Sequence, residues 1–225
     1  MNRKTRVAVL YGGKSGEHEV SLKSAASVLR YIDRDRFEPV PVSIDKQGRW
    51  QCHDLRRIEA TNGDSLPIPA DSPMIRLEPQ GERTAILPAD SAAPTIAPVD
   101  VVFPVIHGPL CEDGAMQGLL ELAGAAYVGS GVLASAVGMH KDIAKRLAAL
   151  AGLPVAPYLA LSRRDWQRDP EGSAEAAQGR LTLPVFVKPC NMGSSVGVHK
   201  VKSWEALRPA LDDAFQYDTL SLIHI

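Results

Sequence analysis

The first 45 residues alternate apolar runs with one amphipathic stretch, which predicts a strand, a helix and a second strand. Residues 6–10 form a short β-rich run that ends at two glycines, and residues 40–44 form a second apolar run. Between them, four apolar residues recur at the spacing of one helix face up to about residue 32: Leu22, Ala25, Ala26 and Leu29. Two strands joined by a helix predict a right-handed parallel crossover.

The middle of the chain contains a proline-rich stretch, a continuous apolar run and a segment with helical spacing. Residues 63–98 contain seven prolines and little periodicity, so we expect loops and edge hairpins there. Residues 99–106 are a continuous apolar run, which is typical of a strand buried on both faces. Helical spacing over residues 114–123 predicts a helix, and a short strand is expected around residues 126–128.

The last hundred residues read as a second set of elements. A glycine-rich join at residues 129–131 predicts a domain boundary near Val132. We expect a helix at about residues 141–151, a strand at 158–161 and an irregular polar stretch at 163–179. Two further strands, at 183–188 and 198–201, would flank a loop at 193–197. A last helix would start from Ser203 as its N-cap and run to about residue 215.

Composition narrows the class of protein. The 225 residues are 45% apolar and 23% charged with a net charge of −1, which indicates a globular chain of one large or two modest domains. The charge balance leaves no basic footprint, so no nucleic-acid partner is expected. No apolar run reaches 18 residues, so no membrane association is expected. Three widely spaced cysteines argue against a disulfide framework and favour a cytoplasmic location.

The turn after the first strand, residues 12–21, is the first candidate site. Residues 8–15 fit a relaxed phosphate-loop pattern, in which the Gly12–Ser15 segment would bind a nucleotide. The other functional interpretation is a ligand site at the carboxyl end of the strand, with Glu17 or Glu19 holding a ligand ammonium and the helix N–H groups facing an anion. Both acids could also simply complement the helix dipole.

The second candidate is the segment of residues 107–114, at the end of the buried apolar run. His107 leaves the strand at its carboxyl end, and a Glu-Asp-Gly sequence opens the next helix. That position indicates the ligand crevice of a parallel sheet. The alternative is a helix cap at Asp113 and a histidine satisfied by the backbone.

The third candidate, residues 183–198, is the most specific. A buried strand ends in Lys188, and the loop Gly193-Ser194-Ser195-Val196-Gly197 leads into the next strand. Glycines allow backbone N–H groups to approach phosphate oxygens, the serines add hydroxyl donors, and the lysine supplies a charge. An ordinary flexible hairpin would explain the glycines but not a lysine after four apolar strand residues.

In this order, the three motifs resemble the D-alanine–D-alanine ligase family of the ATP-grasp superfamily, from about residue 7 to residue 217. The segments Lys-Pro-x-x-x-Gly-Ser-Ser-Val-Gly and His-Gly-x-x-x-Glu-Asp-Gly carry the resemblance. It implies an α/β fold with a Rossmann-like, pre-ATP-grasp amino-terminal domain and parallel sheet at residues 1–131. The first α+β subdomain of an ATP-grasp fold would follow at residues 132–218.

The resemblance also implies an activity. The γ-phosphate of ATP would pass to the carboxylate of a first D-alanine, and the amine of a second would attack the acylphosphate to give the dipeptide used for peptidoglycan precursors. Two magnesium ions, for which manganese could substitute, and a homodimer are implied as well. The second substrate could be D-alanine, D-lactate or D-serine, because the residues that decide it would lie outside this sequence.

Roles follow by motif position. Glu17 would orient the ammonium of the first D-alanine, with Val20, Ser21 and His107 close to it, and Lys141 and Lys188 would contact ATP phosphates. The loop from Gly193 to Gly197 would close over those phosphates, with Ser194 in a hydrogen-bond network that reaches Glu17. Cys111 replaces a glycine that is common in the family's second motif.

One departure from the family pattern concerns the end of the sequence. The second ATP-gripping half, with its adenine hinge, its arginine and its metal ligands, is not found, and residues 219–225 differ from the expected hinge. We therefore expect a truncated product with a tail from outside the family, inactive by itself. A phosphate-loop enzyme and a non-catalytic binding fragment are the alternatives.

Overall fold

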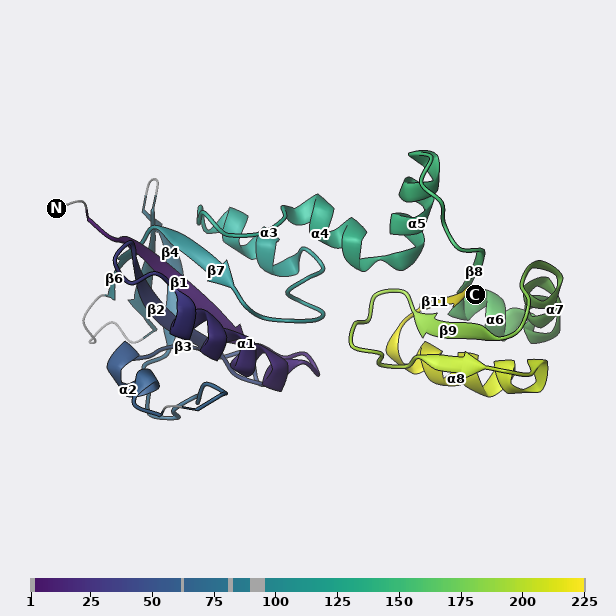
Figure 1. The fold of residues 1–225 in the computed structure, drawn as a ribbon, viewed down its shortest axis with the longest axis horizontal. Helices are drawn as coiled ribbons and strands as arrows, with labels where there is room; N and C mark the ends of the chain where they lie inside the picture. The colour runs from purple at the N-terminus through teal and green to yellow at the C-terminus, as the bar shows by residue number, and fades with distance from the viewer. Residues whose placement is uncertain (1–2, 62, 81–82, 90–95, 225) are drawn as a thin grey trace. The chain divides into compact units, whose positions relative to one another are not determined.

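The computed structural model describes residues 3–61, 63–80, 83–89 and 96–224. The chain divides into two compact units, Met1–Leu133 and Ala134–Ile225. Figure 1 follows the chain from the purple strand of the first unit to the yellow strand of the second. Each unit has its own sheet and its own buried core.

The first unit is built on a four-stranded sheet in the order β3-β2-β1-β7. The central strand β1 (Thr5–Gly12) runs parallel to β2 (Phe37–Ile44) and to β7 (Val101–Pro104), and β3 (Trp50–Cys52) is antiparallel at the edge. Helix α1 (His18–Tyr31) connects the first two strands and lies beside the sheet in Figure 1. The predicted strand–helix–strand unit is confirmed.

Burial explains why β1 is central. Alternate residues point to opposite faces of a strand, and both faces of β1 are covered. Ala8 and Leu10 pack in one apolar cluster with residues of β2, while Val9 and Tyr11 pack in another with the apolar face of α1. The four predicted residues of that helix face are all buried: Leu22, Ala25, Ala26 and Leu29.

The proline-rich region contains more regular structure than the sequence predicts. Helix α2 (Leu55–Glu59) precedes a separate antiparallel sheet of β4 (Ile75–Gln80), β5 (Arg83–Pro88) and β6 (Ile96–Val99). Helix α3 (Ala115–Leu122) is confirmed. The strand expected around residues 126–128 is reduced to a single bridge between Val102 and Tyr127.

The prediction of one strand over residues 99–106 is wrong. The run is divided between β6 and β7, which belong to different sheets, and Asp100 stands between them. The Asp100 carboxylate accepts the backbone N–H of Arg6 at 2.8 Å, and its own N–H donates to the Arg6 carbonyl at 2.9 Å. Strand β7 ends at Pro104, and the N–H of the next residue, Val105, still donates to the Leu10 carbonyl of β1 at 2.8 Å.

The second unit has an antiparallel sheet in the order β10-β9-β11-β8. Its strands are β8 (Tyr158–Ser162), β9 (Val185–Pro189), β10 (His199–Val201) and β11 (Leu220–His224). Its helices are α4 (Val132–Met139), which spans the boundary between the units, α5 (Lys141–Leu150), α6 (Arg163–Arg168), α7 (Pro170–Arg180) and α8 (Leu207–Tyr217). The predicted hairpin of β9 and β10 is confirmed.

Two predictions for this unit need correction. The stretch of residues 163–179 is not irregular, because the side chains of Ser162 and Asp169 cap α6 and α7. Ser203 makes no side-chain cap bond, and a 3-10 turn, Trp204–Ala206, precedes α8. Residues 220–224 form β11 between β9 and β8, and the origin of residues 219–225 outside the family stays a prediction.

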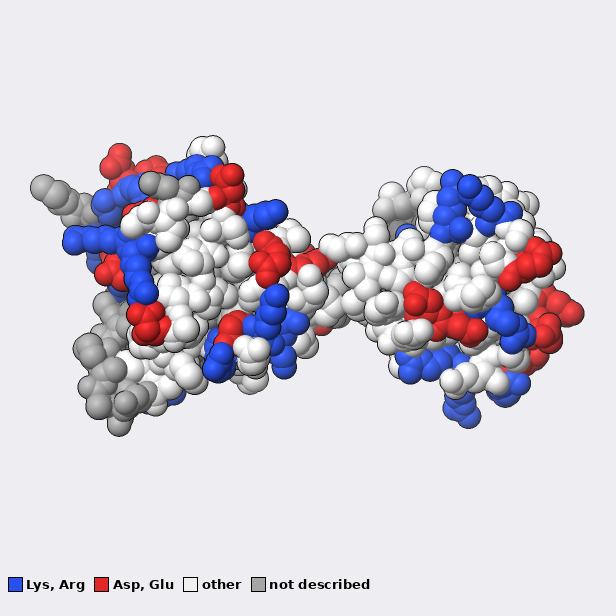
Figure 2. All heavy atoms as spheres, turned by 90° about the horizontal axis from the view of Figure 1, so that it is seen from below, with Lys and Arg blue, Asp and Glu red and all other residues white. Residues whose placement is uncertain are grey.

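The surface of both units is mixed in charge. Figure 2 shows lysine and arginine side chains interspersed with acidic ones over the face that it draws. Among the helices of the described ranges, none has the length and apolar character that a bilayer crossing requires.

Candidate functional site

The turn after β1 uses its own N–H groups within the protein. The Gly12 N–H donates to Ser21 Oγ at 2.8 Å, and the Gly13 N–H donates to the Ile44 carbonyl at 2.6 Å. The residues that a phosphate loop would need as flexible backbone, Val9 to Tyr11, are fully buried in β1. The phosphate-loop interpretation of residues 8–15 is therefore wrong, because residues 8–12 are strand and the N–H groups of Gly12 and Gly13 already have acceptors within the protein.

Ser21 holds two strand ends together. Its side chain is fully buried, accepts from Gly12 and donates to the Val105 carbonyl at 2.6 Å. Val105 directly follows β7, so one hydroxyl joins the carboxyl ends of β1 and β7. That hydroxyl therefore holds in place the strand ends from which the first two candidate motifs extend.

The first and second motifs meet at the carboxyl ends of β1 and β7. Ser15 Oγ donates to the His107 carbonyl at 2.7 Å and accepts the Glu17 N–H at 3.2 Å. Gly108 has φ +78°, and a Cβ added to it would lie 3.1 Å from Glu17 Oε2. The carboxylate of Glu17 therefore lies against Gly108, and a side chain at position 108 would crowd it.

His107 is held by side chains rather than by the backbone. Its Nε2 lies 2.9 Å from Ser24 Oγ on α1, and its Nδ1 lies 3.7 Å from Glu112 Oε1. Glu112 Oε2 also accepts the Gly108 N–H at 3.0 Å. The half-buried imidazole thus lies between Ser24 and Glu112, which orient it from two sides.

The other residues of the first two motifs are either exposed or take part only in local hydrogen bonds and packing. Glu19 is exposed, and a hydrogen bond from Lys46 lowers its pKa, while Val20 is half exposed. Asp113 accepts the N–H groups of Leu110 and Ala115, so it stabilises the turn into α3. Burial raises the pKa of the Cys111 thiol to about 12, so it stays protonated.

Lys141, the first residue of α5, faces the third motif. Its backbone N–H donates to the Cys190 carbonyl at 3.1 Å. Its Nζ donates to the same carbonyl at 3.2 Å and to the Met192 carbonyl at 2.5 Å. Burial, and secondly the charge of Lys188, lower the pKa of Lys141. The ammonium is thus fixed at the start of the loop between β9 and β10.

Lys188 lies on β9 opposite Leu222 of β11. It is half-buried, and burial lowers its pKa, with a smaller contribution from Lys145. Two ammonium groups therefore stand near each other at the loop-bearing end of the sheet, without a carboxylate in ion-pair contact among the described residues. Such a pair favours a multiply charged anion.

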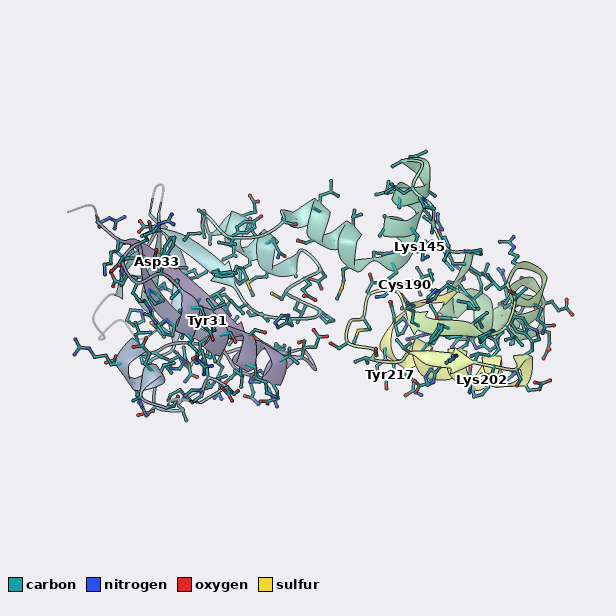
Figure 3. The ribbon with its side chains drawn as sticks, in the orientation of Figure 1. Tyr31, Asp33, Lys145, Cys190, Lys202 and Tyr217 are labelled. Atoms are coloured by element: carbon teal, nitrogen blue, oxygen red, sulfur yellow. The ribbon has the colours of Figure 1, made fainter. Side chains whose placement is uncertain are left out.

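The loop is fixed at its base and exposed at its tip. The Asp218 carboxylate accepts both the N–H and the side-chain amide of Asn191, at 2.8 and 3.0 Å. Ser194 and Ser195 are exposed and both have left-handed backbones, with φ +46° and +61°. Figure 3 places Cys190 and Tyr217 at the same end of the unit, and a Cβ on Gly197 would lie 2.7 Å from the Tyr217 ring.

Sequence reasoning missed Asp218 and Asn191. Neither belongs to a recognisable pattern, because the bond joins residues 27 positions apart whose contact depends on the pairing of β9 with β11. It also missed His140, whose side chain accepts the N–H of Ile143 at the start of α5. A polar residue directly before an amphipathic helix was the signal available there.

Comparisons with known proteins agree with this geometry. A family model described as the D-ala D-ala ligase N-terminus matches residues 6–130, and one described as the C-terminus matches residues 147–224. The D-alanine--D-alanine ligase A of Bradyrhizobium diazoefficiens is 62% identical over 225 residues, and that of Chromobacterium violaceum is 45% identical over 229. The alignments cover 99% and 98% of this chain and 60% of each relative.

Solved structures give the same result. The D-alanine-D-alanine ligase from Coxiella burnetii is similar with a TM-score of 0.80, and the VanG D-Ala:D-Ser ligase from Enterococcus faecalis with 0.78, each at 32% identity. They cover 99% of this chain, which spans 61% and 62% of theirs. The expected α/β fold, Rossmann-like and then ATP-grasp, is confirmed. The chain, which has about 60% of the length of its curated relatives, belongs to the D-alanine–D-alanine ligase family.

Proposed function

We propose that this chain supplies the first D-alanine site and the phosphate-binding loop of an ATP-dependent ligase that joins two D-alanines for peptidoglycan precursors. The observation that carries the proposal is the pair of half-buried lysines, Lys141 and Lys188, at the base of the loop Gly193–Gly197. The amino-terminal unit would bind the amino acid and the second unit would be the first ATP-grasp subdomain.

In this proposal the second unit binds the triphosphate of ATP. An ammonium has three hydrogens, and Lys141 donates two hydrogen bonds to the loop, which leaves one for a phosphate oxygen. Lys188 adds a second charge, and the exposed hydroxyls of Ser194 and Ser195, with the backbone of Val196, would cover the phosphates. Phosphoryl transfer depends on neutralised charge, aligned reactants and excluded water, which this arrangement serves.

The first unit would hold the D-alanine whose carboxylate receives the phosphoryl group. Glu17 carries the charge that a ligand ammonium needs, and Gly108 leaves space against it. His107 and Val20 would border the same place, while Ser21 would act through the strand ends that it joins. The amine of a second D-alanine, the substrate in the names of the curated relatives, would then attack the acylphosphate.

The described residues do not fit a magnesium site. No three His, Cys, Asp or Glu side chains in the described part of the chain gather as metal ligands would. The magnesium or manganese ions of the proposed reaction are therefore assigned to no residue here. A cytoplasmic location, where ATP and amino acids are available, and a homodimer complete the proposal, with small molecules as the other partners.

The nucleotide half of the proposal is tested by calorimetric titration with ATP. Replacing Lys188 or Lys141 with alanine is expected to weaken binding by about tenfold to a hundredfold, because a charged hydrogen bond to phosphate is lost. Lys14→Ala is the matched control, since that exposed lysine lies along Gly48 in the rejected phosphate loop. A larger loss from Lys14→Ala than from Lys188→Ala would contradict the proposal.

The amino-acid half is tested by following D-alanine binding in NMR spectra of the chain. We expect Glu17→Gln to weaken binding about tenfold, because a carboxylate–ammonium contact becomes neutral. Glu19→Gln, two positions away and already paired with Lys46, is expected to change binding by less than about twofold. Equal effects of the two substitutions would place the ammonium elsewhere.

A further inference from the structure

A histidine occupies the position before α5, the helix that begins with Lys141. His140 has an extended backbone, with φ −82° and ψ 93°, and its Nδ1 accepts the N–H of Ile143 at 3.3 Å. Serine, threonine, aspartate and asparagine are the usual residues in this role. A neutral imidazole serves here, with its proton on the other nitrogen.

Three N–H groups of the first turn of α5 have acceptors outside the helix or at its N-cap. The N–H of Lys141 donates to the Cys190 carbonyl at 3.1 Å. The N–H groups of Ile143 and Ala144 go to the side chain and to the carbonyl of His140. The acceptors of these three N–H groups come from two residues, His140 and Cys190, and Cys190 belongs to the base of the loop.

The direction of the Lys141 side chain depends on that turn. Lys141 occupies the first helical position, and from there its Nζ donates to the carbonyls of Cys190 and Met192. The neighbouring Asp142 points inward, is 4% exposed, and accepts two hydrogen bonds from Arg146 at 3.0 and 2.9 Å. Unsatisfied N–H groups at a helix end favour fraying. If the first turn of α5 frayed, the backbone of Lys141 would change direction and its ammonium would leave the loop.

We propose that His140 is a positioning residue for the phosphate-binding Lys141. Its imidazole caps the first turn of α5 by accepting the Ile143 N–H, and the capped turn holds the Lys141 ammonium against the carbonyls of Cys190 and Met192 at the base of the loop. The inference rests on the proposed function only in that the ligand bound by Lys141 is ATP. The hydrogen bonds that link His140 to α5, and Lys141 to residues 190–192, do not depend on any ligand.

The ligand arm of the test compares substitutions at His140 by ATP titration. His140→Ala is expected to weaken ATP binding about fivefold, since a helix without its cap frays. His140→Asn, whose side-chain oxygen is a strong cap, is expected to bind within about twofold of the unmodified chain. If the alanine variant binds ATP as well as the asparagine variant does, the inference is wrong.

Asp169→Ala is the matched structural control. It removes the cap of α7, which accepts the Gly172 N–H at 2.9 Å, at the opposite end of the same unit from the loop. The thermal midpoint is expected to fall as it does in His140→Ala, while ATP affinity stays unchanged. An equal loss of affinity in both alanine variants would show a general loss of stability and would overturn the positioning role.

A second arm uses the chain without nucleotide and separates the two proposals. Amide hydrogen exchange is expected to become at least about fivefold faster at residues 141–144 and 190–192 in His140→Ala, and to return to normal in His140→Asn. Unchanged exchange at residues 190–192 would overturn the inference even if ATP binds. If the unmodified chain binds no ATP, the proposed function fails, and the exchange data alone decide the role of His140.

Discussion

Replacing Gly12 with alanine is expected to lower the free energy of unfolding of the first unit by at least about 3 kcal/mol. Gly12 has φ +92°, and an added Cβ would lie 2.3 Å from the Ile44 carbonyl oxygen. That oxygen accepts the Gly13 N–H, so it cannot move without breaking the contact between the ends of β1 and β2. Urea denaturation measures the loss.

Gly16→Ala is the control for this experiment. Gly16 lies four residues later in the same turn, has no positive φ, and an added Cβ would meet no atom within 4 Å. A change of less than about 0.5 kcal/mol is expected there. If the two substitutions had similar effects, the close approach of Gly12 to β2 would not be a determinant of the fold.

Acid is expected to destabilise the first unit through His53. This imidazole lies 2.7 Å from both Ser43 Oγ and Ser72 Oγ, and it is 5% exposed. Burial lowers its pKa from the ordinary 6.5 to about 4, with a smaller effect of Arg57 opposed by Asp71. Between these values the unfolded chain binds a proton that the folded unit excludes. The stability is therefore complete above pH 6.5 and is lost as the pH falls towards 4.

The expected loss from this group is about 3 kcal/mol between pH 7 and pH 4. Urea denaturation at several pH values measures it. His53→Gln supplies the control, because an amide can bridge two hydroxyls and does not titrate in this range. Carboxylates titrate in both proteins, so the difference between the two pH profiles isolates His53. Parallel profiles would mean that His53 takes up its proton in the folded state.

The sequence predicted best where a single pattern decided the structure. Strand β1 and helix α1 follow from apolar spacing alone, because each buries a continuous face. Helix α7 was missed for the opposite reason, since Ala177 is its only buried residue and its polar sequence has no helical stripe. Its start was still readable, because an aspartate followed by proline is typical of a helix beginning.

The features that could not be predicted from the sequence depend on contacts between residues far apart along the chain. The division of residues 99–106 depends on the pairing of Asp100 with Arg6, 94 positions earlier, which no local pattern reveals. The rule that ligand groups gather at strand ends singled out Glu17, His107 and Lys188 as candidate site residues. It could not show that Ser21 is fully buried between the ends of β1 and β7, because a hydroxyl beside a glycine turn can face either way.

The hydrogen bonds of Lys141 also affect how much side-chain entropy is lost when a ligand binds. A free lysine side chain gives up about 2 kcal/mol of rotational freedom when it is immobilised. Here the carbonyls of Cys190 and Met192 already restrict that motion during folding. An arriving anion would thus encounter a charge in a ready orientation and would not have to order it.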